Sequence, residues 1–177
     1  NVAGTQLTLS GVISGSTRGL TKTGDGNLVL SGANSYSGTT TINQGALILA
    51  ANAPSGSNGT LGNASSAVLL GNTSGSSNAS LITNGAFTIG RAITVQAGNS
   101  GTITIGGTGA NSSSFTGNIT LDKAVTLTAD SGGTATFGTG VISGAGSITK
   151  SGAGTVALSG NNTYGGTTTI NEGTFVV

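Results

Sequence analysis

The stretch LTKTGDGNLVLSGANSYSGTTTINQG, residues 20–45, decides how the rest of the chain is interpreted. A close copy, ITKSGAGTVALSGNNTYGGTTTINEG, occupies residues 148–173. Extended to residues 20–49 and 148–177, the two copies align without gaps and are identical at 16 of 30 positions. Both combine short alternating segments with glycine-containing turns. Internal repetition of this kind is the sequence signature of a solenoid.

Alternating segments of three to six residues also occur throughout the rest of the chain. Each places apolar side chains on one side and mostly threonine on the other, which is the period-two pattern of a half-buried strand. Threonine suits a strand because its Cβ is branched. Such segments lie at residues 6–9, 27–31, 79–83, 87–89, 92–96, 102–105, 118–121, 124–128 and 134–137. The sequence therefore predicts an all-β fold.

The alternating segments continue without a break between the two copies, so we interpret residues 1–177 as one β-helix with long repeat coils at 20–49 and 148–177. A coil of three short strands uses about 20 to 27 residues, which predicts about seven coils stacked about 4.8 Å apart. The chain stops within a strand-like segment, which favours a fragment of a longer solenoid. Residues 52–66 lack the alternation and contain the only proline, so we expect a loop extruded from one coil there.

The composition excludes several classes of function. Gly, Thr, Ser and Asn make up 103 of the 177 residues, and the net charge is +1. Without a basic patch, no nucleic-acid partner is expected. Cys and His are absent, so we expect no zinc or other metal site, no cofactor and no histidine base. The apolar runs are far shorter than the roughly 20 residues of a membrane helix, so we expect no direct membrane insertion of this segment.

The paired glycines, the LSGxNxY stretch and the GTTTIN element of the two copies resemble the autotransporter-associated β-strand repeat. The resemblance covers about a third of the chain directly. It implies a single-stranded, right-handed parallel β-helix that forms part of the passenger domain of an autotransporter-like surface protein. It also implies export through the outer membrane of a Gram-negative bacterium, hence an extracellular or outer cell-surface location.

The charged residues favour a protein that is not an enzyme. Glycoside cleavage requires two carboxyl groups about 5 to 9 Å apart, and the serines have no histidine to act as a base. The acidic residues are spread along the chain at Asp25, Asp122, Asp130 and Glu172. Lys22 and Lys150 recur at equivalent positions of the two copies, where we expect a solvated rim.

A contact surface is expected on loops, which carry recognition on repetitive scaffolds. Tyr36 and Tyr164 occupy equivalent loop positions and are suited to stack on sugars, although clamping the loop onto its coil is the favoured interpretation. Pro54 and Asn58 lie in the predicted extruded loop, our first choice for the contact surface. The serine-rich residues 72–78 and 111–114 are the second choice.

Three functions remain open. The first is a non-enzymatic surface module, a stiff stalk or adhesive passenger segment that contacts glycans or proteins of host or neighbouring cells. The alternative is a self-assembling subunit of an extracellular filament, joined end to end. The third is an ice-binding threonine face, because threonines two residues apart along a strand lie about 7 Å apart. The irregular sequence spacing of these threonine pairs argues against a continuous face.

Overall fold

The computed structural model describes residues 4–177. These residues contain no helix, and therefore none that is long and apolar enough to cross a membrane. The strands are β1 (Gln6–Leu9), β2 (Leu20–Lys22), β3 (Asn27–Leu30), β4 (Thr40–Ile42), β5 (Gly45–Leu49), β6 (Val68–Leu70), β7 (Ala79–Thr83), β8 (Thr88–Ile89), β9 (Ile93–Val95), β10 (Ile103–Gly107), β11 (Ser112–Phe115), β12 (Ile119–Leu121), β13 (Val125–Ala129), β14 (Thr134–Phe137), β15 (Ile142–Gly144), β16 (Ile148–Ser151), β17 (Thr155–Leu158), β18 (Thr168–Ile170) and β19 (Thr174–Val176).

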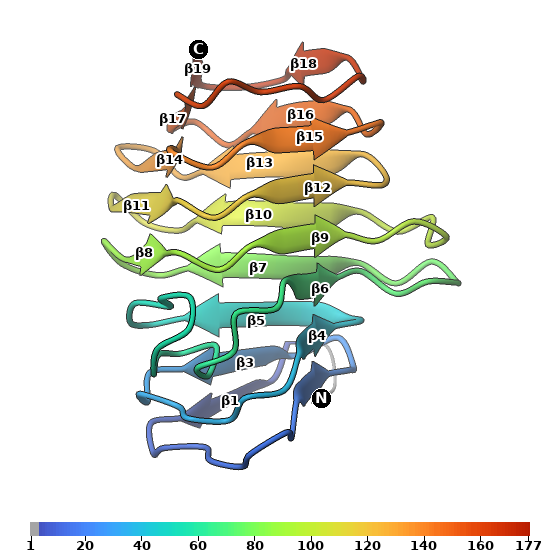
Figure 1. The fold of residues 1–177 in the computed structure, drawn as a ribbon. Coiled ribbons are helices and arrows are strands. Elements are labelled where there is room, and N and C mark those ends of the chain that lie inside the picture. The colour runs from blue at the N-terminus through green and yellow to red at the C-terminus, as the bar shows by residue number, and fades with distance from the viewer. Residues whose placement is uncertain (1–3) are drawn as a thin grey trace.

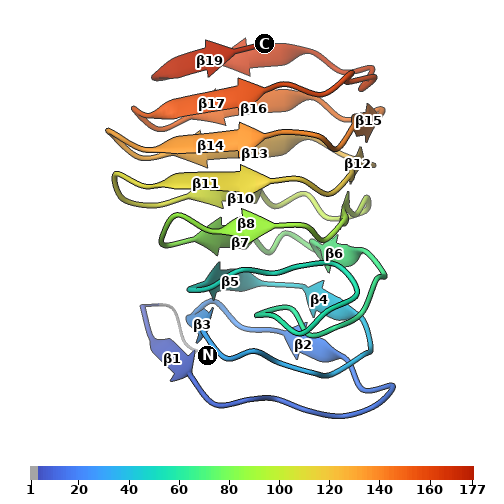
Figure 2. The same cartoon turned by 60° about the vertical axis from the view of Figure 1, so that its left-hand side comes forward.

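The strands stack into a parallel β-solenoid with three sheets (Figures 1 and 2). The eight-stranded sheet has the order β1-β3-β5-β7-β10-β13-β16-β18, the six-stranded sheet β15-β12-β9-β6-β4-β2, and the five-stranded sheet β19-β17-β14-β11-β8. Every pair of neighbouring strands is parallel, as expected when each turn of the chain lies on the turn before it. The prediction of an all-β solenoid of about seven coils is confirmed, with one turn for each strand of the largest sheet.

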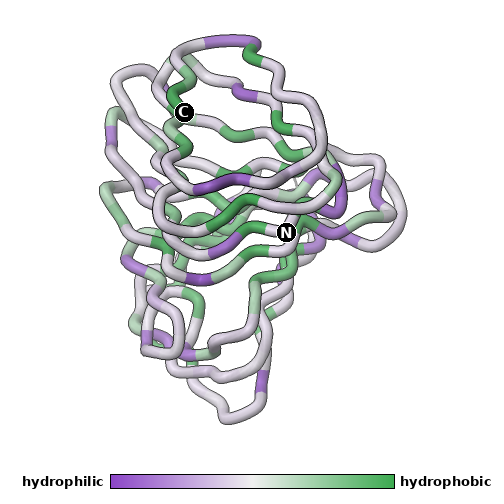
Figure 3. Tube along the Cα trace, turned by 45° about the horizontal axis from the view of Figure 1, so that its top comes forward, coloured by the Kyte–Doolittle hydropathy of each residue, from purple (hydrophilic) through white to green (hydrophobic). Residues whose placement is uncertain are grey.

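The core is a column of apolar side chains enclosed by the three sheets. On β5, Leu47 and Leu49 are fully buried, while Ala46 before them and Ile48 between them are only half-buried. Because the side-chain period of a strand is two, strands such as β5, β13 and β16 contribute alternate residues to the core. Phe115 and Phe137 stack from consecutive turns with their ring centroids 4.8 Å apart. Figure 3 shows the apolar positions recurring along the stacked strands.

Each copy of the repeat stacks upon itself. In the first copy β4 pairs with β2 and β5 pairs with β3; in the second, β18 pairs with β16 and β19 with β17. Gly45, the first residue of β5, and Gly173, directly before β19, both have φ of +72°. A Cβ at Gly45 would also meet the carbonyl oxygens of Gly24 and Gly26. Glycine is required here both by the positive φ and by the close approach.

The two copies lie on different faces of the solenoid. The strands of the first copy belong to the six-stranded and eight-stranded sheets, and its loop at 31–39 lies between them. The equivalent strands of the second copy belong to the eight-stranded and five-stranded sheets. The second copy is therefore displaced by one face around the solenoid, and its equivalent loop at 159–167 lies on another side.

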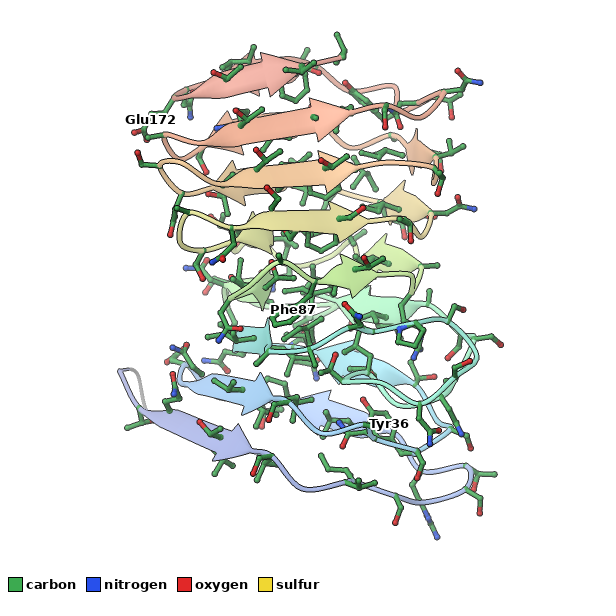
Figure 4. The ribbon with its side chains drawn as sticks, turned by 90° about the vertical axis from the view of Figure 1, so that its left-hand side faces the viewer. Tyr36, Phe87 and Glu172 are labelled. Atoms are coloured by element: carbon green, nitrogen blue, oxygen red, sulfur yellow. The ribbon has the colours of Figure 1, made fainter. Side chains whose placement is uncertain are left out.

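The lysines of the repeat are buried, so the expectation of a solvated rim is wrong. Lys22 Nζ donates hydrogen bonds to the backbone oxygens of Thr23, Gly24 and Gln44 at 2.6 to 3.0 Å. Lys150 Nζ makes the equivalent bonds to Ser151, Gly152 and Glu172 at 2.5 to 2.9 Å. Each ammonium thus joins the turn that follows its own strand to the turn stacked above it. Figure 4 shows Glu172 at this turn in the second copy.

The outward threonines lie in register despite their irregular spacing in the sequence. The register aligns Thr104, Thr126, Thr149 and Thr169 on the eight-stranded sheet, and Ser112, Thr134, Thr155 and Thr174 on the five-stranded sheet. Turns of different length absorb the irregular spacing. Single threonines therefore form one hydroxyl column on each of two adjacent faces. The threonine pairs do not stack as pairs, because Thr128 lies beside Gly106.

Candidate functional site

The most irregular part of the solenoid is the connection between β5 and β6, residues 50–67, here called the long loop. It contains no strand, and an isolated bridge joins Ala53 to Ile89 of β8. Its tip, residues 55–58, is exposed, whereas residues 59–62 are buried. The loop therefore leaves the coil at its tip and then returns into the solenoid. Figure 1 shows this excursion beside β5.

The returning part of the loop, residues 59–63, is called the inserted segment. Leu61 is fully buried and belongs to the apolar core. The backbone of Gly59 forms an antiparallel bridge with Asn34, with N···O distances of 3.0 and 3.2 Å. A Cβ at Gly59 would meet Pro54 Cδ at 2.5 Å, so Pro54 packs directly over the chain as it returns. The inserted segment thus pairs with Asn34, while Ala53 of the same loop takes the strand position next to β8.

Asn34 and Tyr36 of the first repeat copy hold the inserted segment from below. The Asn34 amide Nδ2 donates to Thr60 O at 2.9 Å, while its Oδ1 accepts from Ile13 N at 2.8 Å. Asn63 N donates to Tyr36 O at 3.0 Å. A Cβ at Gly62 would lie 2.8 Å from two carbons of the Tyr36 ring. Asn34 therefore connects three successive turns, and Gly62 leaves the space that the tyrosine fills.

Arg91 holds the inserted segment from above. It is the largest fully buried side chain of the described residues. Its Nη1 donates to Leu61 O at 2.7 Å, and its Nε and Nη2 donate to Ser66 O at 3.2 and 2.5 Å. A guanidinium offers five donors in a planar fork, which suits backbone oxygens held in fixed positions. The loop is therefore an ordered platform anchored on both sides.

Burial changes the pKa of the tyrosine beneath the loop. It raises the pKa of the Tyr36 phenol, while the hydrogen bond to Thr40 Oγ1 at 2.8 Å and the nearby charge of Arg91 act in the opposite direction. Burial likewise lowers the pKa of Arg91. Both shifts have the same physical cause, because the closely packed loop excludes water from these groups.

The structure separates the four candidate contact residues. Tyr36 is 1% exposed and lies under the long loop (Figure 4), so its ring offers no surface to a ligand. Tyr164 is half-buried in the last turn, where its hydroxyl lies 2.8 Å from Thr168 Oγ1. Pro54 is half-buried and Asn58 is exposed at the tip. The structure therefore places Pro54 and Asn58 on the long loop, Tyr36 beneath it, and Tyr164 in the last turn.

The two other predicted contact segments differ from each other. Residues 72–78 form a turn between β6 and β7 in which residues 73–76 are exposed. Most of 111–114, in contrast, belongs to β11, so the expectation of a loop there is wrong. Ser113 of that strand points into the solenoid. In sequence, SSS resembles a loop, but the pairing of β11 with β14 imposes a strand.

Sequence reasoning missed Arg91 and the inserted segment. A single arginine between Gly90 and the strand-like segment 92–96 carries no motif. Its acceptors lie 25 and 30 residues earlier in the chain. One available signal was the small number of charged residues. The chain has only five basic residues, so the position of each of them, Arg91 included, needs an explanation. A second signal was the isolated GTLGN of residues 59–63, whose leucine is unusual for an exposed loop.

These features define a non-helical, weakly charged repeat solenoid with one anchored loop. Residues 20–49 and 148–177 both match the family model of the passenger-associated-transport-repeat. The chain therefore carries two copies of an autotransporter passenger repeat, and the predicted resemblance is confirmed. The two matches together cover 60 of the 177 residues.

A curated protein is similar over part of the chain. The adhesin BmaC autotransporter of Brucella suis biovar 1 (strain 1330) is 58% identical over 41 residues. The alignment covers 23% of this chain and 1% of that protein. The chain thus spans a very small part of the relative's length. No solved structure matches the chain.

Proposed function

We propose that this chain is a non-enzymatic passenger segment of an autotransporter-like protein, displayed outside the bacterial cell. In this proposal the stacked turns act as a stiff stalk and the tip of the long loop is an adhesive contact surface. The observation that carries the proposal is the building of two passenger repeats into one solenoid with a continuous core. The similarity to an adhesin autotransporter supports the adhesive role.

The architecture suits a stalk for a physical reason. Parallel pairing between successive turns runs in all three sheets, and this pairing satisfies the backbone groups of the strands that have a neighbour on both sides. Repeat solenoids contact only their neighbouring turns, so length is added without changing the cross-section. An exposed loop on such a scaffold is presented at a fixed distance and orientation.

The anchoring of the long loop favours its tip as the contact surface. Loops that are held in one conformation lose less entropy on binding than mobile loops. The tip is uncharged and rich in hydroxyl and amide groups, at Ser55, Ser57 and Asn58. These groups are suited to hydrogen bonding with glycan hydroxyls or with polar protein surfaces.

The experiment compares cell and glycan binding of the purified chain with that of a Ser57→Arg/Asn58→Arg variant. The matched control is Ser74→Arg/Ser76→Arg in the exposed turn between β6 and β7. We expect the tip variant to lose at least ten-fold in binding, while the control binds normally and both keep the unfolding midpoint. Equal binding by the tip variant would refute the role of the tip, and a wild-type chain that binds no cells or glycans would refute the adhesive role.

A second candidate, ice binding, is favoured by the alignment of the threonine columns. Their hydroxyls repeat about 4.8 Å apart from turn to turn, as neighbouring strands do. Such an array is suited to hold ordered water at a flat surface. We expect measurable thermal hysteresis at millimolar protein if this function is present, and its absence would eliminate the candidate.

A further inference from the structure

The two repeat copies present the same loop in two different states. In the first copy, Asn34 Oδ1 accepts a hydrogen bond from Ile13 N of the turn below at 2.8 Å. In the second copy, Asn162 Oδ1 accepts the equivalent bond from Ile142 N at 2.9 Å. In both, the tyrosine hydroxyl lies 2.8 Å from a threonine Oγ1 four residues later. The loops thus have the same internal geometry and the same contacts to the turn below.

The contacts to the turn above differ between the copies. Asn34 and Tyr36 are covered by the inserted segment and are fully buried. Asn162 and Tyr164 are only half-buried, and Asn162 Nδ2 has no counterpart of the hydrogen bond that Asn34 Nδ2 donates to Thr60 O. Ile170 is 54% exposed, although its equivalent Ile42 is fully buried. The second copy therefore has the lower half of an interaction whose complete form is present in the first copy.

A hollow lies at this position. It has a volume of about 550 Å³ and is lined by Leu158, Asn162, Tyr164, Thr168 and Val177, among others. Its lining combines the buried Leu158 and the exposed Val177 with an asparagine and a tyrosine equivalent to those that hold the inserted segment in the first copy. Asn162, Tyr164 and Thr168 are here called the socket.

We propose that the socket binds a chain segment with the Gly-Thr-Leu-Gly-Asn pattern of residues 59–63. The first glycine bridges the asparagine backbone, the carbonyl of the next residue accepts from Asn162 Nδ2, and the apolar side chain enters the core. The second glycine passes the Tyr164 ring, and the last residue donates its backbone N–H to Tyr164 O. Each of these contacts is present in the first copy.

We choose this segment because the equivalent asparagine and tyrosine of the first copy, Asn34 and Tyr36, bind residues 59–63. A second copy of the whole chain is the competing occupant. Its first turn would present residues 10–19, SGVISGSTRG, in which the Gly-Thr-Leu-Gly-Asn pattern is absent. The proposal does not depend on the adhesive function, since it compares two sockets within one molecule.

The experiment extends the chain after Val177 by a second copy of residues 50–95. These residues follow the equivalent Leu49 in the natural sequence and include both the inserted segment and Arg91. We expect amide hydrogen exchange at residues 162–170 to slow by at least ten-fold relative to the unextended chain. Asn162→Ala should abolish this protection. The matched control is Asn34→Ala, which should release residues 59–63 of the original loop. In that control, residues 162–170 and the added loop should stay protected.

A second measurement covers the case in which the extension does not fold. A synthetic peptide of residues 50–67 contains no tyrosine, so tyrosine fluorescence reports only on the chain to which it is added. We expect a saturable change that Tyr164→Phe removes and Tyr36→Phe retains. Absence of an effect in both measurements would overturn the proposal. So would concentration-dependent protection of residues 162–170 in the unextended chain, because a second copy would then be the occupant.

Discussion

At the scale of single residues, the buried polar groups distinguish this solenoid from a purely apolar stack. Lys22 and Lys150 place ammonium groups where three backbone oxygens converge, with no carboxylate within ion-pair distance among the described residues. Burial lowers the pKa of both lysines, while Asp25 and Glu172 act in the opposite direction. The lysines therefore stabilise the solenoid through hydrogen bonds that join neighbouring turns.

Removing one of these ammonium groups should destabilise the chain. Lys22→Met keeps the apolar stem but leaves the oxygens of Thr23, Gly24 and Gln44 without their donor. We expect a loss of about 3 kcal/mol in the free energy of unfolding, because buried acceptors without partners are costly. Urea denaturation measures it. The control is Lys123→Met, at a half-buried lysine with two backbone acceptors, which should lower the free energy of unfolding by less. An equal loss in the two variants would contradict the role of the buried acceptors.

Gly45 and Gly56 distinguish two reasons why a position requires glycine, a positive φ and a close approach of other atoms. Both have positive φ, at +72° and +70°, but a Cβ at Gly45 meets backbone oxygens and Lys22 Nζ, whereas nothing lies within 4 Å at Gly56. We expect Gly56→Ala to cost about 1 kcal/mol from strain alone, and Gly45→Ala to cost clearly more. Equal unfolding midpoints for the two variants would show that the close approach relaxes freely.

The buried phenol of Tyr36 should make the chain less stable at alkaline pH. Its pKa in the folded chain is raised above the ordinary value of 10.0. Above that value the unfolded chain loses the proton first and binds fewer protons than the folded chain, so stability falls as pH rises. We expect Tyr36→Phe to weaken this fall and to remove the delayed part of the tyrosinate absorbance titration. A delayed part that persists unchanged in Tyr36→Phe would contradict its assignment to the buried Tyr36 phenol.

At the scale of elements, Arg91 makes the long loop part of the solenoid. Arg91→Ala removes three hydrogen bonds to Leu61 O and Ser66 O and leaves a cavity above the inserted segment. We expect a loss of about 3 to 5 kcal/mol, the range for breaking buried polar networks and cavities, and faster proteolysis within residues 50–67. Arg18→Ala, at an exposed arginine, is the control. An Arg91→Ala loop that resists protease like wild type would show that Asn34 and Tyr36 suffice to hold it.

At the scale of the whole molecule, stability should be highest in the middle of the stack. Each turn contacts only its neighbours, so a turn with neighbours on both sides opens less often than one at the end. We expect native-state hydrogen exchange to be slowest in β7, β10 and β13 and fastest in β18 and β19. Accordingly, Leu127→Ala in β13 should cost several kcal/mol and Ile170→Ala in β18 less than 1 kcal/mol. Uniform exchange along the stack would indicate a single cooperative unit.

The sequence by itself determined the class of the fold and most of its strands. Period-two alternation identified segments such as residues 79–83 and 134–137 with the bounds that the structure gives them. The sequence of residues 20–49 identified the passenger repeat. These properties are local, because the alternation of side chains and the positive φ of glycine act within a few residues.

Only the tertiary structure decided how distant turns meet. The sequence repeat did not reveal that its second copy lies one face further around the solenoid, because that position depends on the summed length of all the turns between. The same dependence aligns Thr104 with Thr126 and brings Arg91 over Leu61. Burial of Lys22, Tyr36 and Leu61 likewise follows from the turn stacked above each of them. A residue's environment in a solenoid is set by the turns above and below it, which lie some 20 or more residues away in sequence.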